Sequence, residues 1–273
     1  MPAYSSILLP WDSQPQESVG IDWDNPLTRG LVLAWTPAHI VEPTTGVAWL
    51  RGRATKAGGI GLSTDPTASG VYYELPAPSS AAAPLASRLD LSALTVACIA
   101  QQPTETNNGR AFVRGHGSGT PAWSIGLNGG SFDGPYASFG ATTFGPSSGD
   151  ATMVGRPHVV SMSGDGATAE LWYDGRLFTS GAYTPPTYAY DAANHRTWIV
   201  GSNGSGAGAG TENYGAFIWN RPLSAEEHRA FHANPWQIFE PRRIWVPVSA
   251  AAPSGFLPAW IRRPQRTIGA GMI

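Results

Sequence analysis

The sequence AELWYDGR at residues 169–176 decides the fold of this chain. Within it, Asp174-Gly175 separates an apolar and aromatic run from a second one that begins at Leu177. Such a pair is a strong short-range signal for a β-hairpin, because a type I′ turn needs positive φ at both central residues. The residues on either side therefore predict two antiparallel strands.

More runs of β-branched and aromatic residues repeat this pattern along the chain. One such run, at residues 158–163, lies just upstream of the hairpin, and two more, at 197–202 and 214–221, lie downstream of it. Gly, Asp and Asn fill the gaps between them. The run at 94–101 is continuously apolar, which predicts a strand buried on both faces. Short strands between turns at this spacing are typical of a sandwich of two sheets. The other predicted strands are residues 31–35, 46–50, 71–75, 111–114, 122–127 and 136–139.

One short helix is predicted near the end of this pattern. Ser224 followed by Glu227 forms a capping box, in which each side chain bonds a backbone N–H of the other residue. Asn234-Pro235 ends the helix, because the residue before a proline is disfavoured in helical conformation. The helix is therefore expected to span about ten residues.

The ordered set of motifs at residues 170–177, 199–202 and 215–227 resembles the C-terminal half of the concanavalin A-like (laminin G-like) jelly roll. The resemblance covers about a third of the chain directly. It implies an all-β fold, a two-sheet antiparallel jelly-roll sandwich with one short helix. A single all-β domain of about 200 residues is an ordinary size.

Composition changes at both ends and predicts three parts: an N-terminal arm at residues 1–30, the sandwich domain at 31–240 and a C-terminal arm at 241–273. The first 30 residues show neither strand nor helix periodicity. The last 33 residues are rich in proline, which rules out regular helix and central strand. They hold five arginines and no acidic residue, so they carry a formal charge of +5.

Aromatic rings and arginines in the two arms are the candidate docking residues for other proteins. Apolar anchors interleaved with guanidinium groups are typical of protein interfaces. Both arms are expected to be extended and to bury these side chains on neighbouring subunits. The candidates are Trp11, Trp23, Arg242, Arg243, Trp245, Phe256, Trp260, Arg262, Arg263 and Arg266.

Residues 11–35 and 234–243 also resemble structural proteins of tailed bacteriophages that carry this jelly roll. The resemblance implies a virion component that is assembled in the bacterial host cytoplasm. Its expected partners are other virion proteins, such as capsid or tail subunits, and further copies of itself. The expected function is that of a capsid decoration protein held by its arms. The sequence leaves open whether it sits on the head or the tail.

Overall composition argues against several other classes of protein. The net charge is −2, which gives no general attraction to nucleic acid. There is no apolar run of about 18 residues, so no membrane helix is predicted, and no signal peptide is visible. The single cysteine, Cys98, lies in an apolar strand and is expected to be a core residue.

Candidate catalytic and metal-binding residues are each explained more simply by structure. Glu170 and Asp174 are four residues apart with Trp172 between them, unlike the paired carboxylates of a glycosidase. Ser147 matches a nucleophile-elbow motif by letter but lies in a glycine- and proline-rich loop. His228 and His232 have zinc-like spacing, and we interpret them as exposed helix residues. No cofactor and no enzymatic activity are therefore expected. The resemblance to this jelly roll leaves calcium open through Asp133, Asp165 and Asn203, although turn chemistry explains each of these residues more simply.

Carbohydrate binding is the main alternative function. Lectins with this fold stack sugars on aromatic rings near loops, and the candidates here are Trp123, Tyr136, Trp172 and Trp198. A sandwich of this size also needs large aromatics in its core. The alternative is therefore a tail-associated adhesin that binds a glycan of the host surface.

Overall fold

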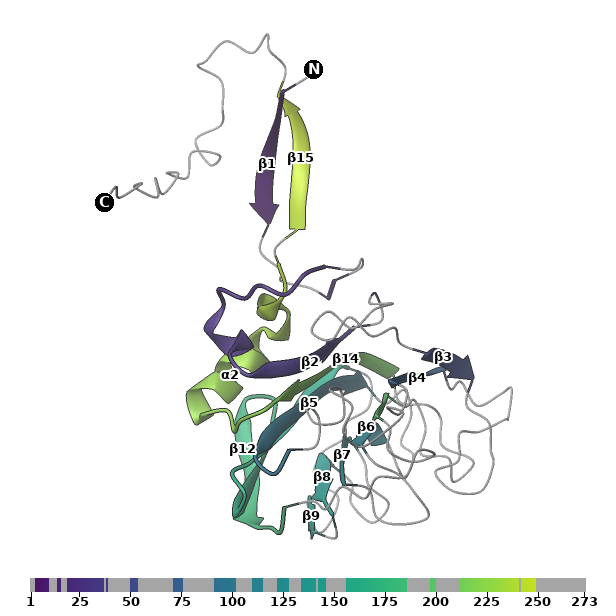
Figure 1. The fold of residues 1–273 in the computed structure, drawn as a ribbon, viewed down its shortest axis with the longest axis vertical. Coiled ribbons are helices and arrows are strands. Elements are labelled where there is room, and N and C mark those ends of the chain that lie inside the picture. The colour runs from purple at the N-terminus through teal and green to yellow at the C-terminus, as the bar shows by residue number, and fades with distance from the viewer. Residues whose placement is uncertain are drawn as a thin grey trace. The chain divides into compact units, whose positions relative to one another are not determined.

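The computed structural model places two sets of strands in a β-sandwich and one pair in a separate ribbon (Figure 1). By their internal contacts the residues divide into Trp11–Glu240 and the two chain ends, Met1–Pro10 with Pro241–Ile273. The structure describes residues 3–9, 14–15, 19–36, 38, 50–53, 71–75, 91–101, 110–114, 122–127, 134–140, 142–145, 156–185, 197–199, 212–240 and 242–248.

The first sheet has six strands, in the spatial order β12-β11-β10-β5-β14-β2. Every neighbouring pair in it is antiparallel. The predicted hairpin forms its edge, and the predicted apolar strand lies near its centre. The strands are β2 (Leu31–Trp35), β5 (Leu94–Gln101), β10 (His158–Gly164), β11 (Thr168–Tyr173), β12 (Arg176–Ala182) and β14 (Glu212–Trp219).

The second sheet has seven strands, in the order β3-β4-β13-β6-β7-β8-β9, and is also antiparallel throughout. The two sheets confirm the predicted all-β antiparallel sandwich. One strand of this sheet, β9, has no counterpart among the predicted strands. The strands are β3 (Leu50–Arg53), β4 (Val71–Leu75), β6 (Arg110–Arg114), β7 (Trp123–Gly126), β8 (Tyr136–Phe139), β9 (Thr142–Phe144) and β13 (Thr197–Ile199).

Strand β5 separates two apolar cores, as its continuous apolar sequence predicts. Val96 and Cys98 belong to the inner core between the sheets, while Ala97 and Ile99 belong to a second core on the outer face. The alternation follows from the two-residue period of a strand. Burial raises the pKa of the Cys98 thiol, as expected for a small core residue.

The outer core is covered by helix α2 (Ala225–Ala233) and the short 3-10 helices η1 (Pro26–Thr28) and η2 (Pro235–Ile238). The predicted capping box is present: Ser224 accepts from the Glu227 N–H, and Glu227 accepts from the Ser224 N–H. Arg221 holds the Glu227 carboxylate at 2.6 Å. This bond and those from Ser224 outweigh the effect of burial and lower the pKa of Glu227 to about 2.

The N-terminal arm at 1–30 is not one element, which corrects the predicted boundary. Ile21 and Leu27 are each 4% exposed and belong to the outer core of the sandwich. Ile21 also forms an isolated bridge with Phe239. The segment lacks strand or helix periodicity, although its apolar residues Ile21 and Leu27 pack into the outer core.

The chain ends form a two-stranded antiparallel ribbon of β1 (Ala3–Leu9) and β15 (Arg242–Val248) (Figure 1). The register pairs Ala3 with Val248 and Leu9 with Arg242. Pro247 lies within β15, which is compatible with the sequence because each strand of a ribbon is an edge strand. The predicted extended arms therefore pair with each other where the structure describes them.

No helix among the described residues is long and apolar enough to cross a membrane.

Candidate functional site

The hairpin turn that decides the fold also builds the candidate site. Asp174 and Gly175 have φ of 43° and 79°, the positive values that the turn requires. The Asp174 carboxylate accepts hydrogen bonds from the Val159 N–H at 3.0 Å and from the His158 ring at 2.9 Å. Arg156 lies 3.3 Å from the same carboxylate. One turn thereby fixes the start of β10 against the end of β11.

Electrostatics keep this carboxylate ionised. Burial by itself would raise the pKa of Asp174, but the hydrogen bonds from His158 and Val159 and the charge of Arg156 outweigh it and lower the pKa. Burial and the adjacent Asp174 charge raise the pKa of Tyr173 to about 12, so its hydroxyl is protonated at neutral pH. The Tyr173 ring stacks on His158, with ring centroids 5.0 Å apart.

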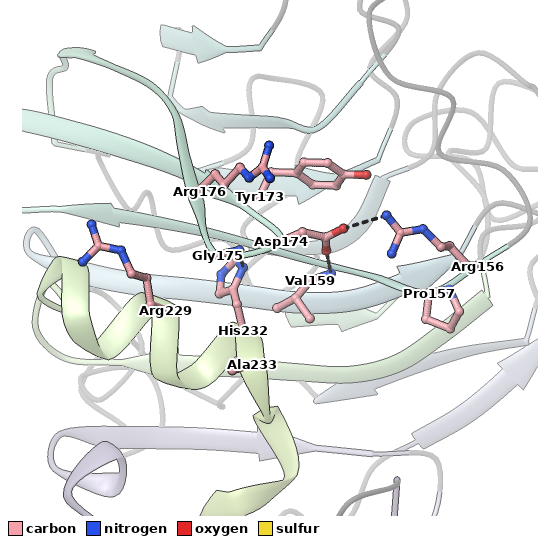
Figure 2. A pocket seen from close by; sticks show the side chains of 10 residues that line it. All are labelled: Arg156, Pro157, Val159, Tyr173, Asp174, Gly175, Arg176, Arg229, His232 and Ala233. Carbon is pink, nitrogen blue, oxygen red and sulfur yellow. Dashed lines mark hydrogen bonds and ion pairs between the residues drawn. The ribbon is translucent and has the colours of Figure 1, made fainter.

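A cavity of about 640 Å³ opens beside the turn, between the β11–β12 hairpin and the C-terminal part of α2. Figure 2 shows Tyr173 and Arg176 on the hairpin side of the cavity and Arg229 and His232 on the helix side. Asp174, bonded to Arg156, lies between them. The full lining is Arg156, Pro157, Val159, Tyr173, Asp174, Gly175, Arg176, Arg229, His232 and Ala233.

Behind this cavity, α2 is joined to β10 by a chain of hydrogen bonds. His232 Nδ1 lies 2.8 Å from the Gly175 N–H, and its Nε2 lies 2.6 Å from Ser161 Oγ. Ser161 Oγ also lies 2.8 Å from His228 Nδ1, and Ser163 Oγ lies 3.0 Å from His228 Nε2. All four side chains are buried.

These distances assign one tautomer to each neutral ring. Because the Gly175 N–H donates to His232 Nδ1, the single proton of His232 must be on Nε2, where it donates to Ser161. The Ser161 hydroxyl then donates to His228 Nδ1, and His228 Nε2–H donates to Ser163. Every polar group in this series of hydrogen bonds then has a partner, as is usual for buried polar groups.

The buried histidines correct the predicted exposed helix face, since His228 and His232 are 0% and 9% exposed. Burial, with the neighbouring His232, lowers the pKa of His228 to about 3, and burial lowers that of His232 to about 4. Both are therefore neutral near pH 7. A signal was present: the histidines share one helix face at i and i+4, and two serines alternate on β10. Their match across the interface could not be deduced without the packing.

Three of the predicted sugar-stacking rings lie in the core. Trp123, Tyr136 and Trp172 are 0%, 4% and 2% exposed, so a sugar cannot reach their faces. Trp172 stacks on His228 with centroids 4.9 Å apart, and Arg229 lies 5.6 Å from the same ring. The Trp172 Nε1–H donates a hydrogen bond to the Glu170 carboxylate. The fourth, Trp198, lies in β13, and its side chain is outside the described residues.

The predicted docking residues are only partly described. Trp23 is 60% exposed on the sandwich unit, the most exposed large apolar side chain among the described residues. Arg242, Arg243 and Trp245 belong to β15, where the structure describes the backbone alone. The remaining predicted docking residues lie outside the described residues: Trp11, Phe256, Trp260, Arg262, Arg263 and Arg266.

The other chemical candidates have structural roles where they are described. Asp165 accepts from the backbone N–H groups of Ala167 and Thr168, as an ordinary turn residue does. Asp133, Ser147 and Asn203 lie outside the described residues. Over the part of the chain that the structure describes, no three His, Cys, Asp or Glu side chains gather as a metal site would need.

Comparison with protein-family models and with curated protein sequences finds no match. Several solved structures share the fold. Trypanosoma rangeli sialidase in complex with the inhibitor DANA has a TM-score of 0.54 and 14% identity over 77% of this chain and 34% of that chain. The same sialidase with sialic acid has a TM-score of 0.52 and 15% identity over 77% of this chain and 33% of that chain. This chain therefore spans about a third of the length of the sialidases it matches.

A third likeness covers nearly all of the other chain. Domain 4 of AbnA, an extracellular GH43 arabinanase from Geobacillus stearothermophilus in complex with arabinotriose, has a TM-score of 0.50 and 10% identity. The match covers 74% of this chain and 98% of that domain. At such identities these likenesses show the fold alone, and they agree with a concanavalin-like β-sandwich.

The comparisons correct one prediction. The sequence predicts a protein without enzymatic activity, but the structures that share the fold are sialidases and a domain of an arabinanase. The sequence-based prediction that excludes enzymatic activity is therefore wrong. The fold is one in which carbohydrate-active proteins occur.

Proposed function

We propose that this chain is a structural component of a tailed-bacteriophage virion, anchored as a capsid decoration protein by its paired terminal strands. The observation that carries the proposal is the pairing of β1 with β15, which joins the two ends of the chain in one ribbon. The protein would be assembled in the bacterial host cytoplasm and act within the virion. Its partners would be capsid subunits and further copies of itself.

The ribbon is the kind of element that a partner completes. A two-stranded ribbon is marginal by itself, because it lacks a third strand and a buried apolar face. No third strand joins it among the described residues. Both outer edges therefore offer backbone N–H and C=O groups, and an added strand from another subunit can pair with them.

Sequence and surface add two further supports. Residues 11–35 and 234–243 resemble phage structural proteins that carry this jelly roll, and the second stretch leads directly into β15. Trp23 exposes 60% of its surface, and aromatic rings of this kind are typical anchors of protein interfaces. The formal charge of +5 after Glu240 fits acidic surfaces on a neighbour.

The experiment deletes the codons for residues 241–273 from the gene in the phage genome that encodes this protein. Purified particles are then analysed by quantitative mass spectrometry. We expect the truncated chain to fold and to be lost from particles, because β1 has lost its partner strand. A variant with Arg29→Gln, an exposed position of the sandwich unit, is the control and should be incorporated normally. Incorporation of the truncated chain at the level of the full chain would refute the proposal.

A second candidate is a tail-associated adhesin that binds a glycan of the host surface. It is favoured by the likeness to an arabinanase domain whose structure contains arabinotriose, a domain of which 98% is matched. The isolated full chain can be tested on a glycan array. Specific binding to host polysaccharide would support this function, and no binding to any glycan would exclude it.

A further inference from the structure

The cavity beside the Asp174 turn has a charge pattern that neither proposed function uses. The residues that line it include three arginines, Arg156, Arg176 and Arg229, and one carboxylate residue, Asp174. Two positive charges are therefore left uncompensated, although the whole chain has a net charge of −2. We propose that this pocket binds an oxyanion carried by a compact ligand, with a sugar acid as the class that fits it best.

The walls of the pocket are held in place before any ligand arrives. Asp174 fixes one wall through the Val159 N–H, and His232 fixes the other through the Gly175 N–H at 2.8 Å. Both bonds involve the backbone, so the turn and the helix cannot move independently. Preformed, concave sites of roughly 300–1,000 Å³ are typical of small ligands. The cavity of about 640 Å³ lies within that range.

The three arginines are not equally available to a ligand. Arg156 already shares its charge with Asp174 at 3.3 Å. Arg176 and Arg229 form no ion pair with any carboxylate among the described residues. Arg229 instead lies over the Trp172 ring, which leaves the guanidinium charge unneutralised. These two groups are the ones expected to contact the anion.

The chemistry of the lining selects an oxyanion on a small body. A guanidinium group presents paired N–H donors that match the two oxygens of a carboxylate, or those of a phosphate or sulfate. Val159 and Pro157 add apolar surface, which a bare ion does not use but a sugar ring does.

The test uses the full chain and isothermal titration with four anions and one neutral sugar. Glucuronate and galacturonate present a carboxylate on a sugar ring, inorganic phosphate and sulfate are bare oxyanions, and galactose is the uncharged control. We expect the anions to bind and galactose to bind at least tenfold more weakly. Tighter binding of the two sugar acids than of the bare ions identifies the ligand class as a sugar acid, and equal binding identifies it as a free oxyanion.

Two substitutions locate the binding. Arg176→Gln and Arg229→Gln each remove one charge and keep most of the side-chain length, and each should weaken anion binding by about tenfold, as expected for one charge-assisted hydrogen bond. Arg29→Gln makes the same charge change on an exposed part of the sandwich unit and should leave binding unchanged. All three variants should keep the wild-type melting temperature, since all three side chains are exposed.

Two results would overturn the inference. If none of the four anions binds in the millimolar range or tighter, the pocket is not an oxyanion site. If binding occurs and Arg29→Gln weakens it as much as Arg176→Gln and Arg229→Gln do, the anion is attracted by general charge and not by this pocket. The terminal ribbon is intact in every variant, so either outcome leaves the anchoring proposal standing.

Discussion

The sandwich and the terminal ribbon are built from the same kind of antiparallel strand, but they differ in what completes them. In the sandwich, two sheets of six and seven strands enclose one core, and helices cover a second. In the ribbon, β1 and β15 pair only with each other among the described residues. The sandwich therefore has the buried apolar surface that stabilises a fold, whereas a two-stranded ribbon is expected to be marginally stable by itself.

The largest expected effect tests whether the sandwich is self-sufficient. Trp219 is 0% exposed, and its Nε1 donates to the Leu27 carbonyl at 2.7 Å. Trp219→Ala should lower the free energy of unfolding by about 3–5 kcal/mol, because it leaves a cavity and an unpaired carbonyl. Denaturant unfolding measures this. The control, Trp23→Ala, changes a residue that is 60% exposed and should cost under about 0.5 kcal/mol.

The next effect concerns the polar bonds that hold α2 on the sheet. Ser161→Ala removes the hydroxyl between His228 and His232 and leaves two buried ring nitrogens unpaired. We expect a loss of about 2–4 kcal/mol, since each unsatisfied buried group costs about 1–3 kcal/mol. Ser180→Ala, on the exposed edge strand β12, is the matched control. A loss no larger than that of the control would show that the network is not formed.

Acid should weaken the same interface. The pKa of His228 is about 3 and that of His232 about 4 in the folded chain, both below the ordinary value of 6.5. The unfolded chain therefore binds more protons below pH 6.5, so the contribution of these histidines to stability falls as the pH falls and levels off near pH 3–4. Protonated His232 would also place an N–H against the Gly175 N–H.

The measurement compares unfolding free energies at pH 7 and pH 5, where the loss should be about 4 kcal/mol, or about 2 kcal/mol for each histidine. Asp174 and Glu227 also have lowered pKa values, but their protonation acts below this interval. The double variant His228→Gln/His232→Gln should have a flatter profile between pH 7 and 5. An equally steep profile in that variant would assign the pH dependence to other groups.

A smaller effect is expected at the start of α2. Ser224→Ala removes the capping hydroxyl that accepts from the Glu227 N–H. It should cost about 1 kcal/mol, and Ser224→Asp, another strong N-cap residue, should recover most of it. Thermal unfolding of the two variants measures the difference. Equal melting temperatures for both would contradict the role of the cap.

The smallest expected effect lies in the ribbon. Removal of residues 241–273 should change the free energy of unfolding of the sandwich by less than about 0.5 kcal/mol, because residues 11–240 form their own unit. A large loss would mean that the sandwich depends on the chain ends and that the contrast between the two regions is false.

Local signals in the sequence were sufficient for most of the sandwich. Asp174-Gly175 predicts the hairpin because few residues adopt positive φ at two successive positions. Ser224 with Glu227 predicts the helix start because a capping box needs these side chains three residues apart. The apolar run at 94–101 predicted burial on both faces. Each of these depends on residues close together in the chain.

Features that depend on distant residues escaped prediction. The pairing of β1 with β15 joins positions more than 230 residues apart, and no local pattern encodes that register. The candidate pocket likewise combines Arg156, the hairpin and α2, which meet only after folding. The sequence predicts His228 and His232 to be exposed because their partners, Ser161 and Ser163, lie 65 or more residues earlier in the chain. The burial of Ile21 likewise depends on a distant residue, because its bridge partner is Phe239.

The most direct test of the anchoring account is hydrogen exchange of the backbone amides in the free protein and in assembled particles. Because a two-stranded ribbon opens easily, amides of β1 and β15 should exchange rapidly in the free protein, while those of β5 and β14 are protected. In particles, the ribbon amides should become protected to a similar degree as the sandwich. Ribbon amides that exchange equally fast in particles, or that are already as protected in the free protein, would contradict the account.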